Sequence, residues 1–173
     1  MIETSGELLY FDGYKYLNAR PWSVKTPFVG MPCMAPAHDG GAPWVRLDID
    51  GWMHFRAGYA WDGPSGPTWD TPNSLRGSQA HDGPYQLSRL SLLPDRSEAM
   101  RERVDRFLYA MLRQDGMSWV RARLWLRGVR VGAAYAWAPQ PEIVKCAPSG
   151  RKIRVPHGQT LEQILAARPE LAA

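Results

Sequence analysis

The sequence is poor in cysteine and has no long apolar run, and both absences narrow the class of protein. The two cysteines, Cys33 and Cys146, lie far apart and in no spacing typical of a metal site, so we expect a reducing compartment or thiols without a role. No segment approaches the roughly 18 consecutive apolar residues of a transmembrane helix. The N-terminus has no basic segment followed by an apolar one, so we expect no secretory signal peptide.

The composition is that of a folded domain with an aromatic core. A chain of 173 residues can bury one core of its own. Hydrophobic residues make up 45% and charged residues 22% of it, which argues against a disordered chain. Eight Trp beside seven Tyr and four Phe indicate a core of large aromatic side chains. The net charge of +4 permits an anionic surface as partner, such as lipid headgroups, without requiring one.

The first sixty residues are typical of antiparallel β-structure. Two pairs of β-prone segments flank the dipeptides Asp12-Gly13 and Asp50-Gly51, which suit two-residue hairpin turns. The paired segments are 7–11 with 14–17, and 44–49 with 52–56. Val45, Leu47 and Ile49 alternate with charged residues and are expected to face the core. Residues 30–43, rich in Gly, Pro, Met and Ala, are expected to form an ordered loop, and the Gly-Pro-rich segment 58–73 cannot be helical.

Three helices are predicted after this β-rich part. The first begins near Asn73 or Ser74, and Gly83-Pro84 should kink it. Its predicted common face comprises Leu75, Ser78, Asp82 and Tyr85.

The second helix has the strongest pattern of the three. Asp95 with Glu98 suggests a capping box, and Gly116 should end the helix. Between them runs an apolar stripe of Met100, Val104, Phe107, Leu108, Met111 and Leu112. The third helix should run from Ser118 to about Tyr135. Its predicted inward residues are Val120, Leu124, Val131 and Tyr135, with Arg123, Arg127 and Arg130 along another face.

These elements predict an α+β fold in one domain spanning 1–173. Residues 1–60 are β-rich, 73–137 helical, and 139–173 an extended tail with a strand at 152–155 and a short helix from Thr160. We expect a small antiparallel sheet from the N-terminal third to pack on about three helices. The aromatics expected in the interface are Trp52, Phe55, Trp61 and Trp119.

The candidate chemistry lies at His81 and Asp105. Asp105 shares the core-facing side of the second helix with Leu108 and Leu112, and burying a carboxylate there needs a partner. A salt bridge to Arg101 or a capping role would satisfy it structurally. The functional alternative is that Asp105 orients a histidine, as in His-based catalytic pairs. His81 is the expected partner, because a short connection makes the two helices antiparallel and places both residues about ten positions from it.

A second expectation concerns a divalent cation. Consecutive helical residues point about 100° apart, so Asp82 should face the 62–66 loop while His81 faces the second helix. Asp82 and Asp62, with loop carbonyls, could hold Ca²⁺ or Mg²⁺, although Asp62 also suits a turn before Gly63.

The other polar residues suggest less. His38, His54 and His157 show no His-x-x-x-His spacing of a zinc peptidase. The arginines of the third helix favour a solvated face over a nucleic-acid groove, so nucleic acid is not the expected partner.

Three segments together resemble a phage and prophage family, domain of unknown function family 1353. They are Ala57 to Pro67 (AGYAWDGPSGP), Ala80 to Tyr85 (AHDGPY) and Arg103 to Phe107 (RVDRF), and the likeness spans about residues 55–137. The resemblance implies a phage-encoded virion, tail or accessory protein. Other phage structural proteins would be its partners, and the virion or the host cytoplasm its location. His81, Asp82 and Asp105 would then only fix the helix pair.

The same residues also resemble the His-Asp helix of phospholipase A2. There a Gly-Pro-rich calcium loop precedes a His-Asp-x-x-Tyr helix, and an antiparallel helix supplies another Asp. The resemblance implies a Ca²⁺-dependent hydrolase with His81 as base, Asp82 as calcium ligand, and Tyr85 and Asp105 as supporting groups. This sequence departs from that family in three respects. It lacks the Gly-x-Gly of the calcium loop and the disulfides of the secreted enzymes, and Gly83-Pro84 is expected to interrupt the helix.

Overall fold

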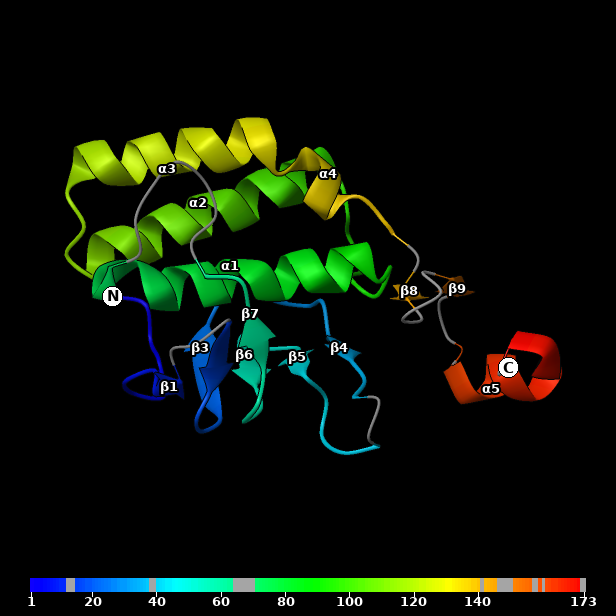
Figure 1. Ribbon diagram of the computed structural model, residues 1–173. Helices are drawn as coiled ribbons and strands as arrows, with labels where there is room; N and C mark the ends of the chain where they lie inside the picture. The colour runs from blue at the N-terminus through cyan, green and yellow to red at the C-terminus, as the bar shows by residue number, and fades with distance from the viewer. Residues whose placement is uncertain are drawn as a thin grey trace.

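A layer of short antiparallel strands lies against a layer of three helices, as the sequence predicted (Figure 1). The computed structural model describes residues 1–11, 15–37, 40–63, 71–140, 142–145, 151–156, 159 and 161–171. Helix α1 lies between the strands and the other two long helices, so it is the central element of the molecule. This arrangement makes the fold α+β, with the strands contributed by the N-terminal part and the long helices by the part that follows.

The strands form two antiparallel sheets in the N-terminal part. The larger has the order β3-β6-β5-β4, with β3 Trp22–Lys25, β4 Cys33–Ala35, β5 Val45–Leu47 and β6 Trp52–Phe55. The smaller has the order β1-β2-β7, with β1 Tyr10–Phe11, β2 Tyr16–Asn18 and β7 Ala60–Trp61. The side chains of Trp22, Val24, Met53 and Phe55 alternate into the core beneath α1, since successive strand residues point to opposite faces.

The predicted hairpin of β5 and β6 is confirmed, but its turn is longer than the expected two residues. Gly51 donates its N–H to the Asp48 carbonyl at 2.9 Å and has a φ of +92°, so three residues connect the paired ends. A side chain at Gly51 would meet the Thr26 carbonyl at 2.7 Å, so glycine is required there. Ile49 falls in this turn and is exposed, so its predicted inward position was wrong. β1 and β2 pair as predicted, but Phe11 lies opposite Leu17, so their connection is also longer than the expected two-residue turn; residues 12–14 lie outside the described part.

Two strands of the larger sheet were not predicted, and neither were β7 of the smaller sheet and β8 Glu142–Lys145 near the C-terminus. β3 pairs with β6 along its whole length, and β4 is the edge strand beside β5. The expectation of a loop throughout 30–43 was therefore wrong at Cys33–Ala35. This strand has only three residues and lies next to Pro32 and Pro36, which hide it from pattern analysis.

Helix α1, Pro72–Arg89, is buried over most of its circumference, and most of its buried residues are small or polar. A side chain at Gly83 would come within 2.8 Å of the Phe55 ring, so the helix axis approaches the sheet closely there. On the α2 side, a side chain at Gly77 would meet Leu112 at 3.2 Å. The helix starts at an N-cap Thr71 and continues through Pro84 to Arg89, so the expectation that Gly83-Pro84 interrupts it was wrong.

Helix α2, Glu98–Gln114, buries all six residues of the predicted stripe. Its N-cap is Ser97, whose side chain accepts from the Met100 N–H, so the predicted capping box on Asp95 was wrong. Asp95 instead accepts from the Ser97 N–H at 2.9 Å. The helix ends just before Gly116, as predicted, with Gly116 at a φ of +85°.

Helix α3, Trp119–Gly132, is turned by almost half a revolution from the predicted orientation. It buries Ala122, Trp125 and Val129, and the short helix α4, Ala134–Trp137, buries Trp137. The predicted inward residues Val120, Leu124, Val131 and Tyr135 are all exposed. Trp119 is exposed too, whereas Phe55 and Trp61 are in the core as expected and Trp52 is half-buried.

The C-terminal part forms a small apolar cluster of its own. β8 Glu142–Lys145 pairs antiparallel with β9 Lys152–Val155, which was predicted as a strand. Helix α5 Leu161–Ala167 and the 3₁₀ turn Pro169–Leu171 follow. The buried residues here are Ile153, Val155 and Ile164, and the segment extends away from the sheet and helix layers (Figure 1).

Candidate active site

His81 and Tyr85 lie one turn apart on α1 and face α2. Their rings are 4.3 Å apart at 34°, and both side chains are buried. Tyr85 also packs edge-to-face against Trp137 of α4, with ring centroids 5.0 Å apart. Trp137 is held in turn by Ser88, whose hydroxyl donates to the Trp137 carbonyl at 2.8 Å. The α4 segment therefore closes one end of the site and fixes the Tyr85 ring.

The predicted contact between His81 and Asp105 is confirmed. Nε2 of His81 lies 2.8 Å from Oδ1 of Asp105. The two residues are level because α1 and α2 run antiparallel: Arg76 near the start of α1 pairs with Asp115 after the end of α2. The short connection between the helices therefore brings His81 and Asp105 opposite each other, as predicted.

The carboxylate of Asp105 is fully buried and accepts from four side chains. Oδ1 accepts from His81 and, also at 2.8 Å, from the Tyr85 hydroxyl. Oδ2 accepts from Arg130 of α3 at 3.1 Å and from Arg101 at 3.5 Å. The salt bridge to Arg101 expected as a structural alternative is thus present together with the histidine contact.

Arg130 was missed as a site residue, since it was grouped with the exposed arginines of α3. Unlike Arg123 and Arg127, it turns toward α2 and also pairs with Glu98. Arg101 pairs with Glu98 as well, and it donates to the carbonyls of Val129 and Arg130 at the end of α3. No sequence signal indicated this role, because the row predicted to face inward on the third helix was Val120, Leu124, Val131 and Tyr135. These ion pairs tie the C-terminal end of α3 to α2 directly beside Asp105.

The electrostatics of the pair favour an ionised Asp105 beside a His81 whose pKa is raised. Burial disfavours the imidazolium, but hydrogen bonds and attraction from Asp105 and Asp82 outweigh it and raise the pKa of His81. Burial likewise acts to raise the pKa of Asp105, yet His81, Tyr85 and Arg130 outweigh it and lower that pKa. Asp105 is therefore suited to stabilise a protonated His81 rather than to take its proton.

A cavity of about 430 Å³ opens beside this pair, between α1, α2 and α3. His81, Asp82 and Tyr85 line its polar wall. The remaining wall is mostly apolar and includes Leu108, Leu112, Trp125, Val129, Gly128 and Gly132. Neither glycine has an atom within 4 Å of where a Cβ would lie, so both leave open space. Such a cavity, apolar with a few convergent polar groups, is typical of a small-molecule site.

The two candidate metal ligands lie near each other but are not equivalent. Asp82 and Asp62 line an adjoining cavity of about 260 Å³, together with Lys15 and Arg89. Asp62 is exposed and forms an ion pair with Lys15. Asp82 is one-third exposed, with its Oδ1 3.7 Å from Nδ1 of His81. Burial raises the pKa of Asp82, and the charge of Asp62 raises it further, while His81 lowers it.

These carboxylates supply only part of a calcium site. Ca²⁺ takes about six to eight oxygen ligands, and no group of three or more potential metal-ligating side chains occurs among the residues that the structure describes. Most of the predicted loop, residues 64–66, lies outside those residues. Asp82 and Asp62 suit a hard cation in their chemistry, because both supply carboxylate oxygens.

A second histidine contact lies on the outer face of the larger sheet. Nδ1 of His54 is 2.7 Å from the Ser23 hydroxyl, and Nε2 is 2.9 Å from Asp48. His54 and Asp48 are each about one-third exposed, and Asp48 is shared with Arg46. His54 thus resembles His81 in its partners but not in its burial, which makes it a natural control.

None of the protein-family models, curated protein sequences or solved structures with which the chain was compared matches it. In the described part of the chain, no helix combines the length and the apolar character needed to cross a bilayer. The assignment of a function therefore rests on the geometry of the His81 site.

Proposed function

We propose that the protein is a hydrolase acting on esters with an apolar chain, with His81 as the general base. The observation that carries the proposal is the buried His81–Asp105 hydrogen bond of 2.8 Å at the wall of a largely apolar cavity. An oriented imidazole at the edge of an apolar site is the arrangement that general-base hydrolysis requires. The resemblance of the His81 helix to that of phospholipase A2 supports the same reaction class.

The residues divide the reaction between them. Asp105 holds Nε2 of His81, so Nδ1 is the nitrogen available on the Asp82 side of the ring. Nδ1 would take a proton from water as the water oxygen attacks the ester carbonyl carbon, giving a tetrahedral intermediate. The same proton would pass to the leaving alkoxide as the ester C–O bond breaks. Asp105 stabilises the imidazolium between these steps, and Tyr85 and Arg130 keep Asp105 ionised.

Asp82 and Asp62 would hold the calcium ion that the phospholipase resemblance implies. A bound Ca²⁺ would polarise the ester carbonyl. Lys15 now pairs with Asp62, so calcium and Lys15 would compete for that carboxylate. Chelation should therefore reduce activity in proportion to how far the reaction depends on the ion.

The test is hydrolysis of a series of p-nitrophenyl esters and of phosphatidylcholine vesicles, with and without a chelator. Replacing His81 with Gln should lower kcat by about 10²- to 10⁴-fold, the usual worth of a general base. His54→Gln, the control on the sheet face, should leave kcat unchanged. Equal activity of wild type and His81→Gln on every ester that wild type hydrolyses, or no hydrolysis at all, would overturn the proposal.

A second candidate is a phage virion, tail or accessory protein in which the polar cluster is structural. The four donors to Asp105 favour it, because a saturated buried carboxylate can serve purely to join helices. The resemblance to the phage family supports that setting, with other phage structural proteins as partners and the virion or host cytoplasm as location. Mass spectrometry of purified particles tests it. Absence from particles, with undiminished stability of His81→Gln, would remove it.

A further inference from the structure

The outward face of α3 is unusually apolar for an exposed helix. Val120, Leu124 and Val131 follow one another at helical spacings of four and seven, opposite the buried face of the helix. They are 50%, 65% and 80% exposed. Trp119 at one end, 59% exposed, and Tyr135 of α4 at the other, 78% exposed, extend the row. We call these five residues, with Arg123 and Arg127, the α3 face.

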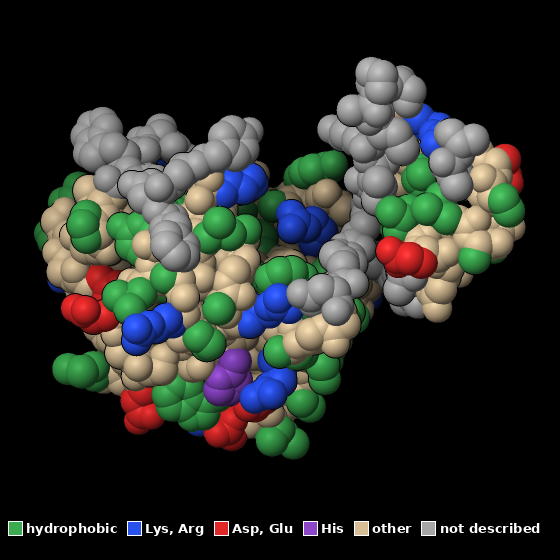
Figure 2. All heavy atoms as spheres, turned by 60° about the horizontal axis from the view of Figure 1, so that its bottom comes forward, with side chains coloured by type: hydrophobic (Ala, Val, Ile, Leu, Met, Phe, Trp, Pro, Cys, Tyr) green, Lys and Arg blue, Asp and Glu red, His purple; other side chains and the backbone are tan. Residues whose placement is uncertain are grey.

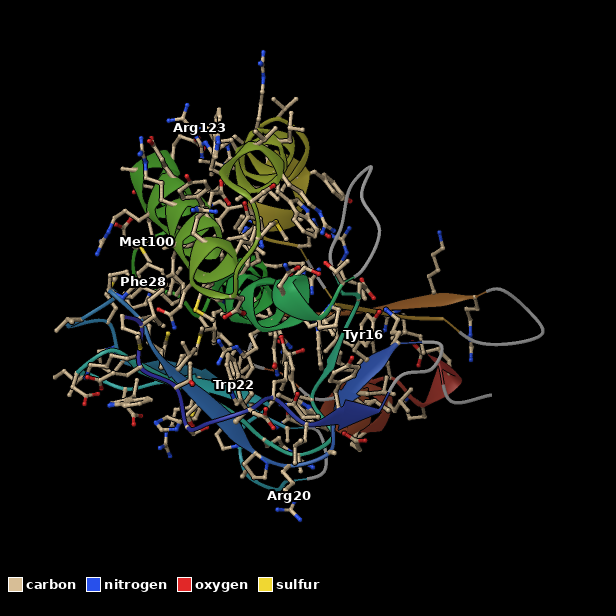
Figure 3. All side chains as sticks on the ribbon, turned by 90° about the vertical axis from the view of Figure 1, so that its left-hand side faces the viewer. Tyr16, Arg20, Trp22, Phe28, Met100 and Arg123 are labelled. Atoms are coloured by element: carbon tan, nitrogen blue, oxygen red, sulfur yellow. The ribbon has the colours of Figure 1, made fainter. Side chains whose placement is uncertain are left out.

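The charge on this face has one sign. Its two charged residues are Arg123 and Arg127, and the sequence from Gly116 to Pro141 contains no Asp or Glu. Arg123 and Arg127 are exposed between the apolar residues, and the guanidinium of Arg123 lies 5.7 Å from the Trp119 ring. Arg123 is on the side of the helical layer that faces away from the sheet (Figure 3).

The opposite side of the molecule differs in kind. Where the strand layer faces outward, acidic and basic side chains alternate with apolar ones (Figure 2). Lys25 pairs there with Asp50, and Arg46 with Asp48. Within the described part of the chain, by contrast, neither Arg123 nor Arg127 forms an ion pair, so unpaired positive charge distinguishes the α3 face from the strand side.

The α3 face also borders the cavity. Gly128 and Gly132 line the cavity. Around the helix, Gly128 lies about 40° from Leu124, and Gly132 about 100° from Val131. Ala136 of α4, next to Tyr135, lines the same cavity. A surface that meets the α3 face would therefore lie at the edge of the space in which His81 is found.

We propose that the α3 face binds the surface of an anionic lipid bilayer. Aliphatic side chains flanked by arginines, with Trp and Tyr at the ends, suit the boundary between headgroups and acyl chains. Anionic headgroups would supply the missing countercharge. A polyanion such as nucleic acid would leave the aliphatic row in water, so charge and apolarity together favour lipid. The inference deepens the proposed function by placing its ester substrate in a membrane, but the binding itself needs no turnover.

Flotation with vesicles of phosphatidylglycerol and phosphatidylcholine tests the inference. Wild type and His81→Gln should both float with vesicles rich in phosphatidylglycerol and much less with pure phosphatidylcholine. Binding should weaken with salt, because the Debye length falls from about 10 Å at 0.1 M to about 3 Å at 1 M. Using His81→Gln separates the two proposals, since loss of hydrolysis with retained flotation leaves the membrane surface standing.

Two pairs of variants locate the contact. Arg127→Gln should lower the vesicle partition coefficient about fivefold, the worth of one basic residue near an anionic surface. Arg106→Gln, an exposed arginine on α2, should change it much less. Leu124→Asp should lower it further, whereas Ile49→Asp, at an equally exposed apolar residue on the sheet side, should not.

Three outcomes would overturn the inference. The first is that wild type does not float with the vesicles. The second is that the α3 variants and their controls lose vesicle binding equally. The third is that the protein self-associates and Leu124→Asp abolishes the dimer but not vesicle binding. Sedimentation of each variant without lipid distinguishes the last of these, because a second copy of the chain would then be the occupant of the α3 face.

Discussion

Replacing Asp105 with Asn should be far more damaging than the same change at Asp48. Both aspartates accept from a histidine and an arginine, but Asp105 is fully buried and Asp48 is one-third exposed. Asn has one oxygen and one NH₂ group, whereas Asp105 accepts on both oxygens. Whichever way the amide turns, its NH₂ group would face donors: His81 and Tyr85 on one side, or the two arginines on the other.

The expected magnitude follows from this mismatch. Removing one partner of a buried ion pair costs about 3–5 kcal/mol, since the remaining charge stays buried. The exposed equivalent costs about 0.2–1 kcal/mol. For a chain of this size, about 2–4 °C of melting temperature is lost per kcal/mol, so Asp105→Asn should melt roughly 6–20 °C below wild type and Asp48→Asn within about 4 °C.

Thermal and urea unfolding, followed by circular dichroism, would measure both variants. The comparison is internal, because each variant loses one negative charge and keeps the same side-chain volume. If Asp105→Asn melted within a degree or two of Asp48→Asn, the carboxylate would not be ionised and saturated as its contacts indicate. Arg130→Gln offers a check of the same network from α3, and its loss of stability should not add to that of Asp105→Asn.

Three further predictions concern the site and its setting. The raised pKa of His81 means that its stabilising contribution is complete below about pH 6.5 and is lost as pH rises through the higher folded-state value. The unfolding free-energy difference between wild type and His81→Gln should therefore shrink as the pH rises above about 6.5, and ester hydrolysis should rise with the pH; a constant difference would contradict the assignment. Gly83→Ala should destabilise by about 1–3 kcal/mol in urea unfolding, because its methyl group would overlap Phe55. Gly128→Leu should fill the cavity and abolish ester hydrolysis while the fold stays as stable as wild type. Ala110→Leu, on the exposed side of α2, should leave both the cavity and ester hydrolysis unchanged.

Helix α2 and the pairing of β5 with β6 could be predicted from the sequence because one apolar period dominates each. In α2 large apolar residues recur every three or four positions, and all six residues of the stripe are buried. In α3 two apolar rows compete, one with Val120 and Leu124 and the other with Trp125 and Val129. Periodicity alone gave the wrong row, because it does not show that Trp125 and Val129 pack in one cluster with Leu108 and Leu112 of α2.

The site was predictable in part for a related reason. His81 and Asp105 could be placed opposite each other because a short connection fixes the antiparallel register of α1 and α2. Arg130 could not be placed, because its approach depends on how α3 is rotated. The burial of α1 was hidden as well, since Gly77 and Gly83 serve close packing but look like helix breakers in a sequence.

The close approach of Gly83 to Phe55 bears on how the cavity can adapt to what it binds. Helix α1 packs closely against the sheet at Gly83 and against α2 at Gly77, so the cavity wall that carries His81 is held rigidly in place. The opposite wall belongs to α3, which meets the cavity through glycines with open space around them. A wider ligand would therefore be accommodated by displacement of α3. Amide hydrogen exchange should slow in α3 when the cavity is filled and stay constant in α1.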